Sequence, residues 1–424
     1  MKISLLYLGC RVNQAEISEM EKALRAGGHE IVGLEDAPDT CIINTCTVTK
    51  KSDDQSRQLI RKASVTGANI VVTGCYAELN SSDIKDIPGN IAIVDNSNKP
   101  YIINKFIDNS SSLTEGITPK HLSRSKYFLK VQDGCDNRCT YCRVWMARGK
   151  SRSVNIDDAV IMSQEAEASG YMEIDLTGIH LGMYGRDFPE SKPGVGGLLE
   201  TLLNKTEKCR FRLSSLEVSE VDERIIEILG DQRVCSHLHI PLQSGDNKVL
   251  LDMGRDYTSE QYAHKINMIH GKLGNIGLGA DVIAGFPSES PEAFERTASL
   301  IKALPFTYLH VFPYSDRPGT IASSMNDSVG TDERKRRAAL LREIGSSKKD
   351  AYMRSNIGRT LEVLLERPGK NSNWLGTSDN YLKVEVLYPT VTDAEEHALK
   401  GRLVNVDVQA SGESSVSGNA IDKL

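Results

Sequence analysis

The chain has 424 residues, of which 39% are hydrophobic and 25% are charged, and its formal net charge is −6. This length suggests about three domains, each able to bury a core of its own. The acidic balance excludes a protein that is basic over its whole surface, so any nucleic acid would have to be held by a local basic patch. No apolar run is long enough for a membrane span, and the N-terminal sequence MKISLLYLGCRVNQAE turns polar too early for a signal peptide.

The chain contains nine cysteines, scattered between positions 10 and 235. An odd number of scattered cysteines does not form a disulfide framework, and it favours metal ligation or catalysis in a reducing compartment. We therefore expect a cytoplasmic protein that does not enter a membrane.

Residues 1–118 alternate apolar runs with helical stretches. Buried strands are expected at 2–8, 41–45, 70–73 and 91–94, and helices near 15–26, 50–64 and 81–86. This alternation predicts an α/β domain with a parallel, Rossmann-like sheet that is covered by helices. Residues 108–118 are rich in Ser and Thr and lack periodicity, which indicates a linker at the end of the domain.

Three cysteines of this first domain, Cys10, Cys46 and Cys75, each follow a predicted strand directly. Because parallel strands of the same sense end at one edge of a sheet, these thiols could meet and hold a metal cluster. The alternative is that they are three small buried hydrophobic residues. Cys41, Cys209 and Cys235 show no such arrangement and are interpreted as core residues.

The alternation restarts in residues 119–354 with longer units. Strands are expected at 127–132, 172–178, 211–216, 237–242, 276–285 and 308–315, and a final helix at 332–354. Six βα units predict a partial (β/α)6 barrel, which would carry its chemistry at the carboxyl ends of its strands.

The loop after the first of these strands reads DGCDNRCTYCRVWMARG, with Cys135, Cys139 and Cys142 spaced C-x3-C-x2-C. Three thiolates can hold three irons of a 4Fe–4S cube and leave the fourth iron open for another ligand. Zinc is the competing interpretation, and it would need a fourth ligand such as His180. Tyr141 either packs on the barrel rim or forms a wall for a ligand at the open iron.

Residues 355–411 contain short strands with Gly, Asn and Pro turns, which predicts a small antiparallel β-barrel. The final residues, 412–424, are expected to be a disordered tail.

A local basic patch is present around the three-cysteine loop. Residues 120–152 hold nine Lys or Arg against Asp133 and Asp136, and such a patch is suited to phosphate contacts. The nine are Lys120, Arg124, Lys126, Lys130, Arg138, Arg143, Arg148, Lys150 and Arg152. A second basic run, at 334–337, either makes further phosphate contacts or is an ordinary solvated helix face.

The motifs LGCRVNQAE, INTCTVT and VTGCYAE, with the three-cysteine loop, ARGKSRS, LTGIHLGMYG, HLHIPLQSGDNKVL and HVFPYSDRPGT, occur in this order. Nearly the whole chain thereby resembles the radical S-adenosylmethionine (SAM) methylthiotransferases. The resemblance implies two 4Fe–4S clusters, with Cys10, Cys46 and Cys75 holding the auxiliary cluster and Cys135, Cys139 and Cys142 holding the SAM cluster. It also implies that residues 355–411 form a TRAM domain, which binds RNA.

The family replaces an aryl C–H bond with C–SCH3 and uses two SAM molecules, one as a methyl donor and one as a radical source. By this resemblance, further candidates for binding SAM are Tyr141, Thr177, Gly178, Ser215, Glu217 and Gln243. Gln243 could equally form hydrogen bonds within a loop, and Gly178 could simply form a turn. His180, His237, His239 and His310 are interpreted as core histidines. Val144-Trp145 stands where the family usually has Ile-Pro.

The segments GCRVNQ, LTGIHLG and HVFPYS most resemble the branch that acts on N6-threonylcarbamoyladenosine at tRNA position 37. The resemblance then implies as partners the tRNA anticodon loop, a reductant such as flavodoxin or ferredoxin, and a sulfur donor. The alternatives are the same chemistry on isopentenyladenosine in tRNA or on an aspartate of a ribosomal protein. Functions of another class are a non-catalytic iron–sulfur carrier and a zinc-binding RNA module.

Overall fold

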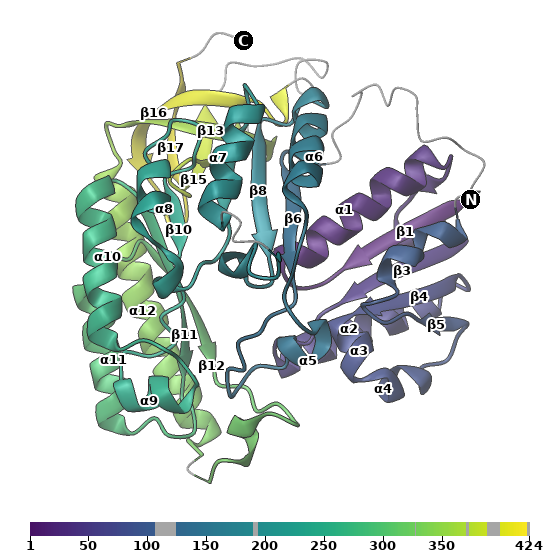
Figure 1. The fold of residues 1–424 in the computed structure, drawn as a ribbon, viewed down its shortest axis with the longest axis horizontal. Coiled ribbons are helices and arrows are strands. Elements are labelled where there is room, and N and C mark those ends of the chain that lie inside the picture. The colour runs from purple at the N-terminus through teal and green to yellow at the C-terminus, as the bar shows by residue number, and fades with distance from the viewer. Residues whose placement is uncertain (107–123, 190–193, 327, 370–372, 388–398, 422–424) are drawn as a thin grey trace.

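The computed structural model describes residues 1–106, 124–189, 194–326, 328–369, 373–387 and 399–421 (Figure 1). The linker predicted at 108–118 lies outside the described residues. Among the helices that are described, none combines the length and the apolar composition needed to cross a membrane.

The N-terminal part is a parallel sheet with the strand order β2-β1-β3-β4-β5, as the alternation of apolar runs predicts. Its strands are β1 (Lys2–Tyr7), β2 (Glu30–Ile31), β3 (Thr40–Thr45), β4 (Asn69–Gly74) and β5 (Ile91–Ile93). Its helices are α1 (Arg11–Ala26), α2 (Lys50–Ser64), α3 (Cys75–Leu79) and α4 (Ser81–Lys85). Every residue of β3 is buried, because helices cover both faces of the sheet at its centre.

The central part is an open barrel of six parallel strands, whose backbone hydrogen bonds form two sheets, β7-β6-β8-β9 and β10-β11-β12. The strands are β6 (Tyr127–Asp133), β8 (Glu173–Gly178), β9 (Arg210–Leu213), β10 (His237–His239), β11 (Gly277–Ala284) and β12 (Tyr308–Pro313), with β7 (Arg152–Ser153) antiparallel at the edge. Bridges from Phe211 to Val234 and from Ser215 to His239 join the two sheets. The expected partial (β/α)6 barrel is thus confirmed.

The barrel helices lie on the outside of the strands, and a core of mainly aliphatic side chains fills the space between them. They are α6 (Ile156–Ala168), α7 (Val195–Lys205), α8 (Glu223–Ile228), α9 (Asn247–Asp252), α10 (Ser259–Leu273), α11 (Pro291–Ala303) and α12 (Thr331–Ser355), and the short α5 (Val144–Arg148) lies in the loop after β6. Helix α1 of the N-terminal sheet packs against β6, so the two parts share an interface (Figure 1).

The C-terminal part is a closed barrel with the strand order β13-β14-β15-β17-β16. Its strands are β13 (Thr360–Pro368), β14 (Trp374–Ser378), β15 (Lys383–Leu387), β16 (Leu403–Ser411) and β17 (Val416–Ala420). The pairs are antiparallel except β15 with β17, which run parallel.

The prediction of a disordered tail at 412–424 is wrong for most of its length, because β17 closes this barrel. Val416 is completely buried, and a Cβ on Gly418 would come within 2.0 Å of the Asp407 carbonyl oxygen. The small and polar residues that suggested disorder therefore permit a close approach between two backbones. Residues 422–424 lie outside the described part of the chain.

A buried carboxylate joins the open barrel to the C-terminal barrel. Glu173 of β8 forms ion pairs with Arg210 at 2.6 Å and Arg212 at 3.1 Å, both from β9, and all three side chains are at most 2% exposed. The same guanidinium groups donate to the carbonyl oxygens of Thr377 at 3.2 Å and Ser378 at 2.9 Å in the C-terminal barrel. These contacts fix how the two barrels meet.

We expect Glu173→Gln to lower the free energy of unfolding by about 3–5 kcal/mol, because it removes the buried carboxylate that two buried guanidinium groups share. Urea unfolding followed by circular dichroism measures this change. The matched control is Glu200→Gln, whose partner Arg224 is 46% exposed, and it should change stability by less than about 1 kcal/mol. Equal effects of the two substitutions would contradict this role of Glu173.

Candidate active site

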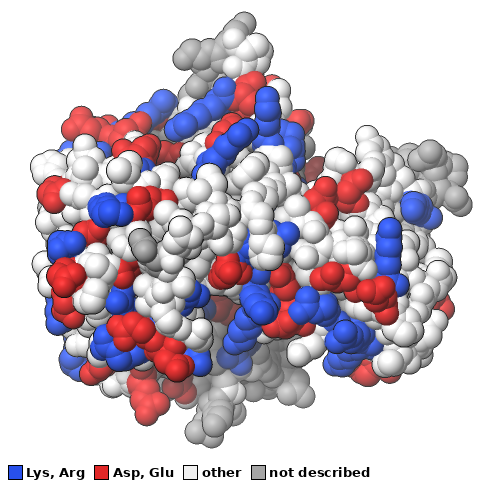
Figure 2. Space-filling view, turned by 90° about the horizontal axis from the view of Figure 1, so that it is seen from below, with Lys and Arg blue, Asp and Glu red and all other residues white. Residues whose placement is uncertain are grey.

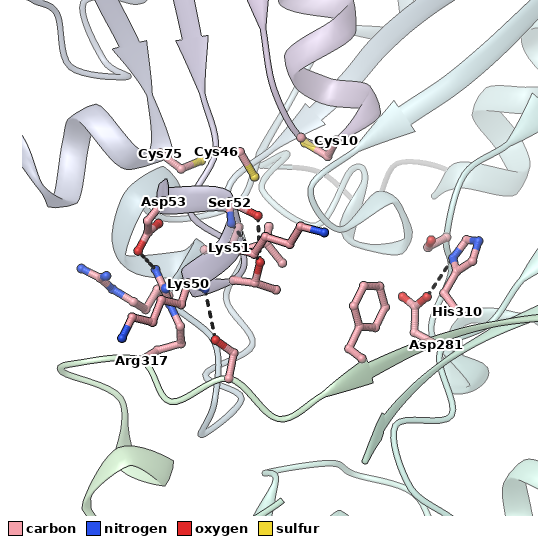
Figure 3. Close-up of a pocket in the computed structure, with 18 of the residues that line it drawn as sticks. Cys10, Cys46, Lys50, Lys51, Ser52, Asp53, Cys75, Asp281, His310 and Arg317 are labelled. Carbon is pink, nitrogen blue, oxygen red and sulfur yellow. Dashed lines mark hydrogen bonds and ion pairs between the residues drawn. The ribbon is translucent and has the colours of Figure 1, made fainter. Parts of the chain in front are cut away.

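Three thiols from distant parts of the N-terminal sheet line one cavity of about 1500 Å³. Cys10 precedes α1 just after β1, Cys46 directly follows β3, and Cys75 opens α3 at the end of β4. Because these strands are neighbours and parallel, their carboxyl ends bring the three loops together. Figure 3 shows the three side chains along the same wall of the cavity.

The loops that carry Cys10 and Cys46 touch. Gly9 has φ +97°, and a Cβ at this position would come within 2.6 Å of the Cys46 sulfur. Burial raises the pKa of Cys46 to about 11, and the nearby Cys10 and Cys75 thiols act in the same direction. The three sulfur atoms do not all lie within 4.8 Å of one another, so the trio is too wide for a single ion and could instead hold a larger metal cluster.

The second trio, Cys135, Cys139 and Cys142, lies in the loop between β6 and α5. The Cys135 N–H donates to the Gly149 carbonyl at 3.0 Å, which closes the loop on itself. Arg255 donates to the Cys139 sulfur at 3.4 Å and forms an ion pair with Glu217. Sequence reasoning did not single out Arg255, because no local pattern places it next to this loop.

His180 lies beside this trio. Its Nδ1 is 3.5 Å from the Cys135 sulfur, and its Nε2 is 2.7 Å from the Glu220 carboxylate. The interpretation of His180 as a mere core histidine is therefore incomplete. The geometry fits an N–H···S hydrogen bond, whereas no three of His180, Cys135, Cys139 and Cys142 bring their ligand atoms within 4.8 Å of one another, as a zinc site would need.

The two trios are neighbours. Helix α3, which begins with Cys75, packs against α5, which follows Cys142. Burial raises the pKa of Cys142 to about 11, and the Cys139 and Cys75 thiols both add to this rise. Arg143 and Val144 line the large cavity, whereas Cys135, Cys139 and Cys142 lie beside its lining.

The remaining predicted site residues fall into two groups. Thr177, Gly178 and Ser215, at strand ends of the open barrel, line the cavity. Three others lie outside the lining of this cavity. Of these, Glu217 is engaged by Arg255, Tyr141 packs edge-on against Phe286 with ring centroids 6.5 Å apart, and Gln243 has φ +64° in a loop.

A polar wall of His239, Asp281 and His310 stands across the cavity from the cysteines (Figure 3). Asp281 lies 3.0 Å from His239 Nε2 and 3.2 Å from His310 Nδ1. Burial raises the pKa of Asp281, but the hydrogen bonds from the two histidines outweigh burial and hold it well below its usual range. The ligand atoms of the three residues lie within 4.8 Å of one another, so they could also hold a divalent ion. The core interpretation is wrong for His310, whose side chain is 52% exposed.

Several side chains of the predicted basic patch are buried or form ion pairs within the protein, so they do not face solvent as a patch. Lys126 pairs with Glu173, Lys130 pairs with Glu16, and Arg148 is 3% exposed. On the face shown in Figure 2, the described Lys and Arg side chains alternate with Asp and Glu. The basic run at 334–337 is mostly ion-paired within its helix, and Arg334 is its member that lines the cavity. Lys120 lies outside the described residues.

Two family models match the chain. Residues 2–95 match the model described as "Uncharacterized protein family UPF0004", and residues 129–301 match "Radical SAM superfamily".

Named relatives cover most of the chain. The chain is 35% identical to the threonylcarbamoyladenosine tRNA methylthiotransferase MtaB of Bacillus subtilis, over 89% of this chain and 88% of that protein. It is 27% identical to the tRNA-2-methylthio-N(6)-dimethylallyladenosine synthase of Geobacillus kaustophilus, over 97% of this chain and 83% of that protein. The fold is similar to the radical SAM methyltransferase TsrM of Kitasatospora setae, with TM-score 0.55 and 14% identity over 76% of this chain and 77% of that one.

We expect the anaerobically reconstituted protein to bind about eight iron atoms per chain, four for each trio. Substituting Cys10, Cys46 and Cys75 together with Ala, or Cys135, Cys139 and Cys142 together, should leave about four. Iron and acid-labile sulfide analysis measures the result. A wild-type content of about four iron atoms would contradict a second cluster.

Gly9→Ala should also lower the iron content to about four, because the new Cβ would displace the Cys46 sulfur. Gly28→Ala is the matched control, since Gly28 also has a positive φ, of +77°, but a Cβ there meets nothing within 4 Å. If both variants lose the same amount of iron, backbone strain rather than the contact with Cys46 is the cause.

Proposed function

The chain belongs to the MtaB-type radical SAM methylthiotransferases, and on this premise we propose that it replaces the C2–H of N6-threonylcarbamoyladenosine at tRNA position 37 with C2–SCH3. The observation that carries the proposal is the proximity of two cysteine trios, of which one lines the cavity and the other lies in the loop before α5, which packs against α3. Sulfur insertion needs both metal centres within reach of one base, and an iron–sulfur carrier or a zinc module needs no such arrangement.

The donor sets suit the cofactors of this family, which are 4Fe–4S clusters and SAM. Each trio offers three thiols without a fourth cysteine, which leaves one iron open in each cube. We assign Cys10, Cys46 and Cys75 to the auxiliary cluster and the other trio to the SAM cluster. The match of residues 129–301 to the radical SAM superfamily favours iron–sulfur over zinc at the second trio. When bound, these cofactors supply the one-electron chemistry and the sulfur.

The protein's own groups position the reactants. We propose that Thr177, Gly178 and Ser215 meet SAM, because they line the cavity at strand ends of the open barrel. Phe312 lines the same cavity with 40% of its surface exposed, and an unpaired base could stack on such an aromatic face. The base would then lie between the auxiliary trio and the polar wall of His239, Asp281 and His310.

This wall favours the threonylcarbamoyl substrate. The threonylcarbamoyl group carries N–H, hydroxyl and carboxylate groups, and Asp281 and His310 can pair with such groups. Lys51 points into the cavity (Figure 3), and within the described part of the chain no ion pair engages it. An isopentenyl group is a hydrocarbon that offers these groups no hydrogen bond and would bury the Lys51 ammonium without a partner, which a binding site penalises strongly.

The partners follow from the same proposal. We propose a tRNA anticodon loop as substrate, a low-potential reductant of the flavodoxin or ferredoxin class, a sulfur donor and a cytoplasmic location. We further propose that residues 1–118 form the auxiliary-cluster domain, 119–354 the radical SAM domain and 355–411 a TRAM domain, whose barrel extends to Ala420 through β17.

The reconstituted enzyme should methylthiolate an anticodon stem-loop that carries N6-threonylcarbamoyladenosine at least about 100-fold faster than one that carries isopentenyladenosine. Mass spectrometry of the digested nucleosides, with SAM and dithionite present, measures both products. Asp281→Asn is expected to reduce this preference. Product from the isopentenyl substrate alone would transfer the assignment to the other tRNA branch, and 5′-deoxyadenosine without either product would point to a non-tRNA substrate.

A further inference from the structure

One buried guanidinium, that of Arg148, contacts the auxiliary trio from the loop that carries the second trio, and nothing in the proposed reaction yet uses it. We propose that Arg148 is a positioning residue, which donates a hydrogen bond to the sulfur of Cys75 and raises the reduction potential of the auxiliary cluster. The proposal rests on the assignment of Cys75 as a ligand of that cluster.

The guanidinium is held in one orientation by three side chains, two from α1 and one from α3. Its Nε donates to the Cys75 sulfur at 3.2 Å, its Nη1 to Glu16 at 2.5 Å and its Nη2 to Asn13 at 2.7 Å. Arg148 is 3% exposed, so water does not compete for these donors. A lysine could supply the charge here but not the planar fork that makes these bonds together.

Asn13 extends this contact to the other two auxiliary cysteines. Its amide nitrogen donates to the carbonyl oxygens of Leu8 at 2.7 Å and Thr45 at 3.0 Å. Leu8 lies just before Cys10, and Thr45 immediately precedes Cys46. Through one side chain and its amide partner, Arg148 is therefore connected to all three loops of the auxiliary trio.

The charges around Arg148 leave a positive excess beside the trio. Glu16 is paired with Lys99 at 2.7 Å, Lys130 at 3.1 Å and Arg148, and Arg148 also lies 3.3 Å from Asp133. Arg152 also lies 3.7 Å from Asp133, so four cations pair with these two carboxylates. In a water-poor site, an uncompensated positive charge favours the more negative, reduced form of a nearby cluster. Hydrogen bonds to cluster sulfurs act in the same direction on its potential.

Arg148 also belongs to the loop that carries the second trio. It ends α5, which follows Cys142, and its neighbour Gly149 accepts the hydrogen bond from the Cys135 N–H at 3.0 Å. A displacement of Arg148 would therefore move one trio relative to the other. Arg148 therefore sets both the reduction potential of the auxiliary cluster and the position of that cluster relative to the SAM site.

The potential can be measured without any turnover in the variant that carries Ala at positions 135, 139 and 142, which retains only the auxiliary cluster. Into this background we would introduce Arg148→Gln, Arg148→Lys and the control Arg25→Gln, which removes an exposed arginine of α1 whose partner is Glu21. EPR-monitored redox titration gives the midpoint potential. We expect about four iron atoms in each protein, a more negative potential for Arg148→Gln, a smaller shift in the same direction for Arg148→Lys, and no shift for the control.

In the enzyme with both trios intact, Arg148→Lys should lower the yield of methylthiolated nucleoside per 5′-deoxyadenosine formed. SAM cleavage continues in this variant, but the two sites no longer hold their positions relative to each other. An unchanged potential in an iron-loaded Arg148 variant would overturn the proposal. Loss of iron from both Arg148 variants would also overturn it, since Arg148 would then be needed for assembly instead of tuning. A wild-type enzyme without methylthio product would reject the proposed function, and the potentials would still decide the role of Arg148.

Discussion

A buried carboxylate at the interface of two domains organises the centre of this protein. Glu16 of α1 is 4% exposed and is neutralised by cations from three other segments, Lys99, Lys130 and Arg148. Burial raises the pKa of Glu16, but the three cations outweigh burial and hold it well below its usual range. A buried charge is tolerated only with such complete pairing. The N-terminal sheet, β6 and the three-cysteine loop therefore have one relative arrangement that satisfies Glu16.

A second interface joins the C-terminal barrel to the open barrel through Tyr381. Tyr381 of that barrel, at φ +72°, enters the open barrel and stacks on His237 with ring centroids 4.1 Å apart. Its hydroxyl accepts from Arg11, which follows the proposed cluster ligand Cys10 and pairs with Asp175 at 3.3 Å. The C-terminal barrel thus forms part of the cavity lining and is not a loosely tethered RNA-binding module.

These junctions explain why the charge count of a segment overstates its capacity for RNA. The cations between 120 and 152 form a patch in the sequence because they are close along the chain, yet several of them neutralise buried carboxylates of other segments. Of the described cations in this segment, Arg143 is the one that lines the cavity, where Lys51 and Arg334 join it from other segments. Phosphate contacts require solvent-facing cations, and exposure is decided by packing, which a local count does not contain.

The sequence by itself determined the domain order, the parallel sheet, the six βα units and the two cysteine trios, because strand periodicity and short motifs are local properties of the chain. It could also indicate that Cys10, Cys46 and Cys75 meet, since parallel strands end at one edge. Only the tertiary structure decided that Arg148 contacts Cys75, that Asp281 joins two histidines into a wall, and that residues 416–420 close a barrel. Each of these depends on contacts between residues far apart in sequence, and such contacts are selected by the burial and pairing of charges and by close backbone approach.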